Sequence, residues 1–128
     1  MSAHPVYVLF DPQCPHCGHL WEAALPLQSK AKFVWIPVSI INSTSTRQGA
    51  ALLSASNPAE AMAAHEKSIL AGTGGMSAPA TVPPDLEQAI KKNTALFSSY
   101  QGANQLHIRE AVYLHVNRAN SVARDRIQ

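Results

Sequence analysis

Cys14 and Cys17 are the two cysteines of the 128-residue chain, and Pro15 and His16 separate them. A run of β-branched and aromatic residues at 6–10 precedes the pair, and a segment of helical character follows it. A Cys-x-x-Cys motif between a strand and a helix places the first sulfur at the helix N-terminus, where free amide groups and the helix dipole favour an anion. The motif therefore predicts a stabilised Cys14 thiolate and thiol–disulfide chemistry.

The other residues of the motif have predicted roles as well. His16 provides a further donor or a positive charge beside the first sulfur, and Pro15 suits the first helical turn, where its missing N–H would be unpaired in any case. Cys17, one helical turn on, is the expected resolving thiol. Because a stabilised thiolate favours the reduced pair, we expect an oxidising redox potential. The predicted catalytic residues are therefore Cys14, Cys17, His16 and Pro15, with no metal and no organic cofactor.

Other uses of the two cysteines remain open on the residues alone. A structural zinc ion usually has four ligands, and the candidates here are the cysteines with His16, His19 or His65. A passive disulfide would close too small a loop to stabilise the fold much. Haem attachment requires a histidine directly after the second cysteine, and Gly18 occupies that position.

Three further features have plainer interpretations. Asp11, followed by proline after a strand, is typical of a turn. Trp21 lies four residues after Cys17 on the same helical face, where we expect core packing. The segment 72–75 holds three glycines but lacks the Lys-Ser/Thr pair of a phosphate-binding loop, so we interpret it as a flexible loop.

The elements that must position the cysteines follow from the apolar pattern. Residues 6–10 and 33–38 predict strands with a helix over 19–25 between them, a βαβ unit with parallel strands. Pro26 should interrupt that helix, and Pro37 suggests a strand near an edge or a bulge. Helices are expected over about 46–55, 58–70 and from 84, and a third strand over 111–116. Residues 120–128 receive no assignment.

The composition is that of one globular domain. Hydrophobic residues make up 46% and charged residues 14% of the chain, which excludes a disordered, highly charged protein. The formal net charge is +2 and the basic residues are spread along the chain, so we expect no nucleic-acid partner. No apolar stretch reaches the roughly 18 residues that a membrane span requires. No secretory signal is visible at the N-terminus, which leaves open a cytosolic protein or one whose leader is missing.

The segment 6–21, which contains the motif, resembles the active-site segment of the periplasmic thiol:disulfide interchange proteins of the DsbC/DsbG family, and its DsbG members most. The resemblance continues through 35–41 and 49–60 to about 102–104. It implies an α/β, thioredoxin-like fold with a helical insertion at about 46–100, in a single domain over 1–128. It also implies that Cys14 is the nucleophile and Cys17 the resolving thiol, whereas Pro15-His16 is more like the strongly oxidising DsbA proteins.

The resemblance further implies the setting of the reaction. We expect disulfide interchange of the reductase or isomerase type in the periplasm, acting on protein substrates with disulfides or oxidised cysteines. A membrane thiol reductant would keep the pair reduced.

Three departures from the family pattern lead to an alternative. The family has a cis-proline just before its third strand, but no proline follows Pro84 here, and the pattern changes near 101–105. The chain ends about where the last strand and helix of the family come, so we expect these to be truncated and an exposed sheet edge to favour self-association. The dimerisation domain of the family is also missing. The alternatives are therefore a catalytically impaired thioredoxin-like binding module or a zinc-binding protein.

Overall fold

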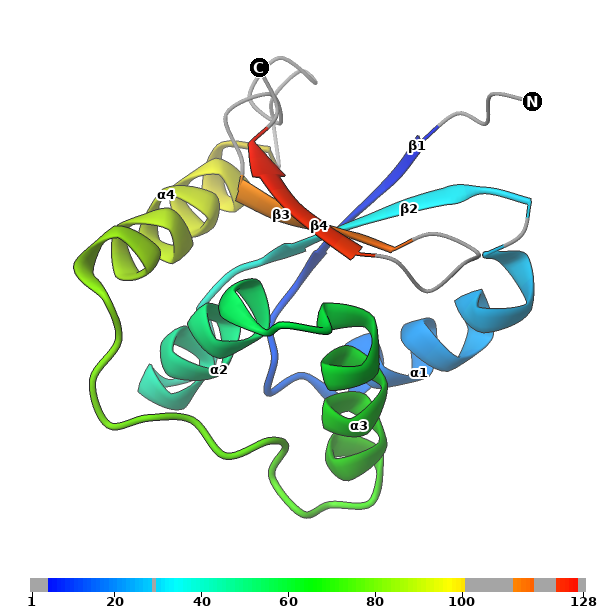
Figure 1. Ribbon diagram of the computed structural model, residues 1–128, viewed down its shortest axis with the longest axis horizontal. Coiled ribbons are helices and arrows are strands. Elements are labelled where there is room, and N and C mark those ends of the chain that lie inside the picture. Colours follow the sequence, from blue (N-terminus) through cyan, green and yellow to red (C-terminus); the bar gives the residue numbers. More distant parts are fainter. Residues whose placement is uncertain (1–4, 29, 101–111, 117–121, 127–128) are drawn as a thin grey trace.

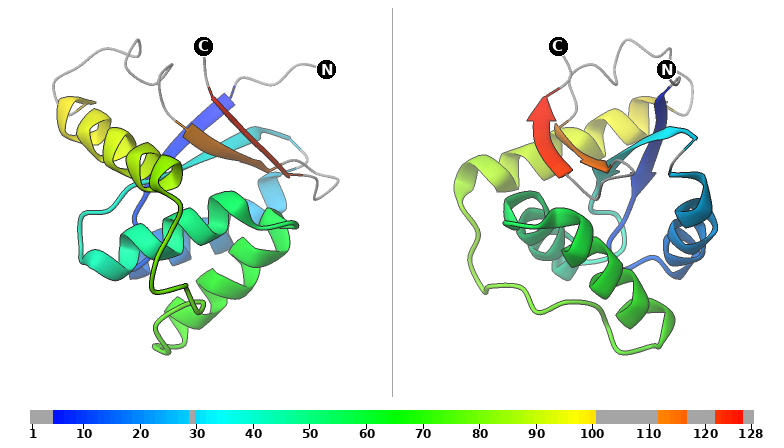
Figure 2. Two further views of the ribbon diagram at one scale, coloured as in Figure 1. Left: turned by 60° about the vertical axis from the view of Figure 1, so that its left-hand side comes forward. Right: turned by 45° about the vertical axis from the view of Figure 1, so that its right-hand side comes forward.

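The computed structural model describes residues 5–28, 30–100, 112–116 and 122–126. In chain order the elements are β1 (Pro5–Phe10), α1 (Pro15–Ala24), the 3-10 turn η1 (Leu25–Leu27), β2 (Lys32–Pro37), α2 (Ser43–Ser54), α3 (Pro58–Leu70), α4 (Pro84–Tyr100), β3 (Val112–Val116) and β4 (Val122–Arg126). Figure 1 shows α1, α2 and α3 below the sheet and α4 to its left. The two views of Figure 2 show α2 between α3 and α4.

The described strands form one sheet in the order β1-β2-β3-β4. β1 and β2 are parallel, with Val8 opposite Trp35, which confirms the predicted βαβ unit. β3 runs antiparallel to β2 and to β4. The predicted third strand is thus confirmed, whereas leaving 120–128 without an assignment was wrong, because β4 lies there.

Pro37 does not mark an edge strand, contrary to expectation. β2 lies between β1 and β3, and Pro37 is its last residue, opposite Phe10 of β1. The pairing of β2 with β3 ends two residues earlier, at Trp35. Pro37 therefore lies beyond the part of β2 that pairs with strands on both sides, which is where an internal strand can accept a proline.

Both faces of β2 are buried, and its alternating side chains enter two apolar clusters. Trp35 lies in the larger cluster with Phe10 and Trp21, and its ring meets theirs edge-on, with centroids 5.7 and 5.2 Å away. Val34 and Ile36 point to the other face. The Trp21 contact fastens α1 to the sheet, which confirms the predicted core role of this residue.

The helix boundaries follow from their caps. Asn57 caps α3 with a hydrogen bond from the Glu60 amide, and Pro58 is the first helical residue, as predicted. Asn42 caps α2, which begins at Ser43, three residues before the predicted start. α1 ends at Ala24 and passes into the 3-10 turn that holds Pro26, so the predicted interruption is confirmed.

The predicted mixed α/β class is confirmed, and its helices and small sheet are compatible with a thioredoxin-like fold. Residues 101–105 and the position expected for the cis-proline of the family lie outside the described residues. In the described part of the chain, no helix has the length and apolar character needed to cross a membrane.

Candidate active site

Cys14 is the N-cap residue of α1, and Pro15 is the first helical residue. The Cys14 backbone is extended, with φ −90° and ψ 118°, and its amide donates to the Asp11 carbonyl oxygen at 2.9 Å. The Cys14 side chain makes no capping hydrogen bond. Its position is nevertheless the one the motif predicts, because the amides of His16 and Cys17 in the first turn have no carbonyl partner within the helix.

Cys17 lies one turn on, partly buried against the larger apolar cluster. Both thiols are free, and the side chain of Cys14 is near enough to interact with that of Cys17. Burial raises the pKa of Cys17 to about 12. The Asp11 backbone lowers this pKa by hydrogen bonding, whereas the Cys14 thiol and the charge of Glu66 raise it further. Cys17 therefore keeps its proton at neutral pH.

The remaining residues of the motif face solvent. Pro15 and His16 are exposed, and His19, one turn further along α1, is exposed as well. The structure thus brings Cys14 and Cys17 together and leaves His16 exposed at the surface.

Asp11 holds the segment that leads from β1 to Cys14. Its carboxylate is buried and accepts four hydrogen bonds: Oδ1 from the Gln13 amide and the Ser45 hydroxyl, and Oδ2 from the Ile40 and Ile41 amides. The bond to the Gln13 amide, two residues on, confirms the predicted turn. The bonds from Ile40 and Ile41 tie the turn to the chain between β2 and α2, and the bond from Ser45 ties it to the first turn of α2.

Gln13, directly before Cys14, belongs to a second network. Its Nε2 donates to the Gln48 Oε1 atom at 2.6 Å and to the Gly74 carbonyl oxygen at 3.0 Å. Gln48 is buried, and its own Nε2 donates to the carbonyl oxygens of Gly74 and Met76. The 72–76 segment is a loop, as predicted, and these bonds join it to the loop that carries Cys14.

His65 of α3 also hydrogen-bonds to both segments, the loop before Cys14 and the 72–76 segment. Because the Met76 amide donates to Nδ1 at 3.0 Å, the ring proton is on Nε2, which donates to the Pro12 carbonyl oxygen at 2.6 Å. The ring is fully buried, which lowers its pKa, and the bond to Pro12 opposes that shift. Since both ring nitrogens are engaged, His65 is not available as the zinc ligand that the sequence left open. Gly75 has a φ of +87° and packs closely on this ring.

Glu66, the next residue, is buried at the contact between α1 and α3. A Cβ atom on Gly18 would lie 3.1 Å from the Glu66 Oε2 atom and 3.0 Å from Cγ of Leu70, so a glycine there lets the two helices approach. Neither carboxyl oxygen has a hydrogen-bond partner in the described part of the chain. Burial raises the pKa of Glu66 to about 8.

Sequence reasoning missed Glu66 and Gln48, although a signal existed for the first. Met62, Glu66 and Ile69 have helical spacing and share the buried face of α3. That periodicity predicts burial of a residue at 66. It does not predict that the glutamate faces the turn that carries Cys17.

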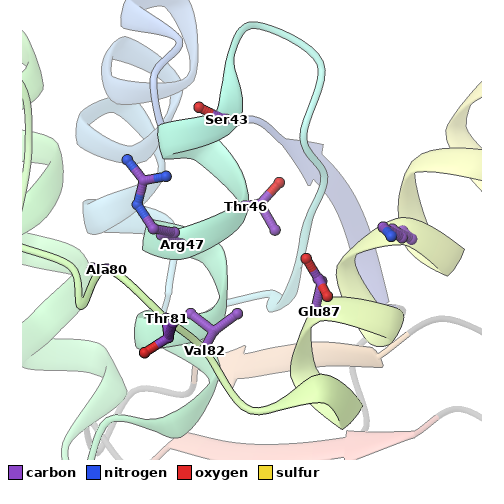
Figure 3. Close-up of a pocket in the computed structure, with 8 residues that line it drawn as sticks. Ser43, Thr46, Arg47, Ala80, Thr81, Val82 and Glu87 are labelled. Atoms are coloured by element: carbon purple, nitrogen blue, oxygen red, sulfur yellow. The ribbon is translucent and has the colours of Figure 1, made fainter.

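A separate cavity of about 320 Å³ lies between α2, the segment 80–82 and α4 (Figure 3). Thr46 and Arg47 line it from α2, and Glu87 and Lys91 line it from α4. Neither cysteine belongs to its lining, so the cavity is not part of the cysteine site. Among the residues described, no three His, Cys, Asp or Glu side chains are grouped so that they could hold one metal ion.

The comparisons with known proteins agree with the motif. No family model matches the chain. The curated thiol:disulfide interchange protein DsbG of Pseudomonas aeruginosa is 33% identical over 100 residues, which are 77% of this chain and 38% of that protein. The Escherichia coli protein of the same name is 30% identical over 110 residues, which are 84% of this chain and 42% of that protein. The chain thus spans about two fifths of the length of the curated relatives it matches. Over the stretch it shares with them, the chain belongs to the DsbG-like thiol:disulfide interchange proteins of the DsbC/DsbG family.

Proposed function

We propose that the chain is a thiol:disulfide oxidoreductase that acts on protein cysteines through Cys14 and Cys17. The observation that carries the proposal is the position of Cys14 at the N-cap of α1, with the free thiol of Cys17 beside it. A helix N-terminus favours the thiolate at the first position, while burial keeps the second thiol protonated. The relationship to the DsbG proteins supports the same chemistry.

The reaction has two exchange steps. The Cys14 thiolate attacks one sulfur of a client disulfide, so that a mixed disulfide forms and the other client sulfur leaves as a thiolate. Cys17 then loses its proton and attacks the Cys14 sulfur. The Cys14–Cys17 disulfide forms, the client leaves as a thiolate, and the client has gained the two electrons that the pair has lost. In the opposite direction the same steps oxidise a client dithiol.

The finer assignments are part of the proposal. His16 stabilises the Cys14 thiolate from the exposed side, and Pro15 starts the helix. We place the reaction in the periplasm, on clients with disulfides or oxidised cysteines, with a membrane thiol reductant as donor. We also assign the chain to a single thioredoxin-like domain in which 46–100 forms the helical insertion, with self-association through an open sheet edge.

One sequence feature favours a second candidate. No proline follows Pro84, so the cis-proline that the family pattern places before the third strand has no counterpart in the sequence. Without that group the chain would be a catalytically impaired, thioredoxin-like binding module that retains the fold but lacks the client groove.

Turnover of insulin disulfides with wild type, Cys14→Ser and Cys17→Ser separates the two candidates. The oxidoreductase predicts activity in wild type and none in Cys14→Ser. It also predicts a Cys17→Ser protein that accumulates a mixed disulfide at Cys14, visible on a non-reducing gel. Equal slow rates in wild type and Cys14→Ser, with no mixed disulfide, would establish the binding module instead.

A further inference from the structure

Glu66 is a buried acid that the two exchange steps above leave without a role. Its side chain is fully buried on α3, and neither carboxyl oxygen accepts a hydrogen bond from the described residues. Desolvating a carboxyl group without a partner costs several kcal/mol if the group is charged. A group that no described contact stabilises, placed beside reactive thiols, points to a chemical role.

The position of Glu66 relative to the cysteines follows from helix packing. The place of a Cβ atom on Gly18 is 3.1 Å from the Glu66 Oε2 atom, and Gly18 directly follows Cys17. The charge of Glu66 is also felt at the Cys17 thiol, where it opposes ionisation. The carboxyl group thus lies at the inner side of the turn that carries the resolving thiol.

The resolving step requires a proton acceptor at this place. Only a thiolate attacks a disulfide. Burial is the largest cause of the raised pKa of Cys17 and persists in the mixed disulfide, so Cys17 holds its proton at neutral pH. Cys17 is also packed against the apolar cluster, away from bulk water on that side. Attack therefore needs a nearby base that takes the proton as the sulfur–sulfur bond forms.

Building on the proposed function, we propose that the Glu66 carboxylate accepts the Cys17 proton when Cys17 attacks the mixed disulfide at Cys14. The Cys17 sulfur bonds to the Cys14 sulfur, the bond between Cys14 and the client breaks, and the client leaves as a thiolate. The proton on Glu66 then passes to that thiolate or to water, which restores the carboxylate.

Other groups near the site do not fit this task. Asp11, the other buried carboxylate among the described residues, already accepts four hydrogen bonds. Both ring nitrogens of His65 are engaged. His16 and His19 are exposed. The pKa of Glu66, raised to about 8 by burial, lies close to the pH at which such an enzyme would work, and this suits a base that must take and release a proton.

Reaction of the reduced protein with an aromatic disulfide, 5,5′-dithiobis(2-nitrobenzoate), separates the two steps in one trace. Attack by Cys14 releases the first coloured thiolate, and attack by Cys17 on the mixed disulfide releases the second. In Glu66→Gln the second release should be about 100-fold slower or more, with the first within about twofold of wild type. Glu60→Gln, an exposed change on the same helix, is the matched control and should alter neither step.

The pH profile distinguishes a proton acceptor from a structural role. In wild type the second step should level off above about pH 8, whereas in Glu66→Gln it should keep rising about tenfold per pH unit, because only solvent removes the proton. A second step as fast in Glu66→Gln as in wild type would overturn the proposal, and so would equal slowing of both steps. Should glutamine disturb the fold by circular dichroism, Glu66→Met answers the same question. A wild-type protein that releases no second thiolate would refute the proposed function itself.

Discussion

The buried carboxyl group of Glu66 makes the stability of the protein depend on pH in a predictable direction. Its pKa is raised from 4.5 to about 8 because the folded chain removes it from water. A group whose pKa is raised on folding contributes stability that is fully present below its unfolded value and is lost as the pH rises through the folded value. The folded state should therefore weaken between about pH 4.5 and pH 8.

The magnitude follows from the size of this change. Each pH unit between the two values costs about 1.36 kcal/mol, so the whole interval amounts to about 5 kcal/mol. Between pH 6.5 and pH 8 alone the loss is about 2 kcal/mol. Glu66→Gln removes the titrating group and keeps the size of the side chain. The free energy of unfolding of this variant should gain about 2 kcal/mol relative to wild type over that interval.

Urea denaturation followed by circular dichroism, at several pH values from 5 to 8 under reducing conditions, measures this difference. Two other groups, His65 and Cys17, also have shifted pKa values and contribute to the pH dependence of stability. Burial lowers the pKa of His65, so its stabilising contribution is present above pH 6.5 and is lost as the pH falls through the lower value. The raised pKa of Cys17 matters only above pH 9. Since both groups are common to the two proteins, parallel stability curves for wild type and Glu66→Gln would show that folding does not raise the pKa of Glu66.

Two further predictions concern the loops beneath Cys14. Gly75→Ala should cost about 3 kcal/mol or more of unfolding free energy in urea, because the residue has a φ of +87° and its Cβ atom would lie 2.5 Å from Cε1 of buried His65. Gly72→Ala, with a φ of +77° but no atom within 4 Å, should cost only about 1 kcal/mol, and equal losses would show that the His65 contact is unimportant. Asp11→Asn should cost about 2–4 kcal/mol by the same measurement, because an amide NH₂ replaces an oxygen that accepts two hydrogen bonds. A loss below about 0.5 kcal/mol would mean that the carboxylate does not hold this turn.

The elements next to the cysteines could be predicted because their signals are local. The β-branched run at 6–10, the turn at Asp11 and Pro15 at the first helical position all act within a few residues. The start of α3 at Pro58, directly after its cap Asn57, could be predicted in the same way. The start of α2 was placed too late, because Ser43 and Thr44 are poor helix formers and the cap at Asn42 outweighs them.

The features that sequence reasoning missed depend on contacts between distant segments. β4 has the sequence VARDR, and its strand character comes from pairing with β3 rather than from an apolar pattern. Gln48 is polar and lies in a helix, yet it is buried because the 72–76 segment crosses it. Glu66 faces the turn that carries Cys17 because Gly18 admits α3 against α1, and no local pattern joins two positions 48 residues apart. The cysteine pair could thus be predicted from the sequence, whereas most of the long-range contacts around it could not.

The proposed function requires that Cys14 is an activated nucleophile beside a protonated partner, Cys17. The most direct test is the rate of iodoacetamide alkylation of Cys14 against pH, measured by mass spectrometry in Cys17→Ala so that one thiol is followed. At neutral pH, Cys14 in Cys17→Ala should be alkylated faster than a free cysteine, whereas Cys17 in Cys14→Ala should react only at far higher pH. A Cys14 that reacts no more readily at neutral pH than a free thiol would contradict the proposed role of Cys14 as the nucleophile.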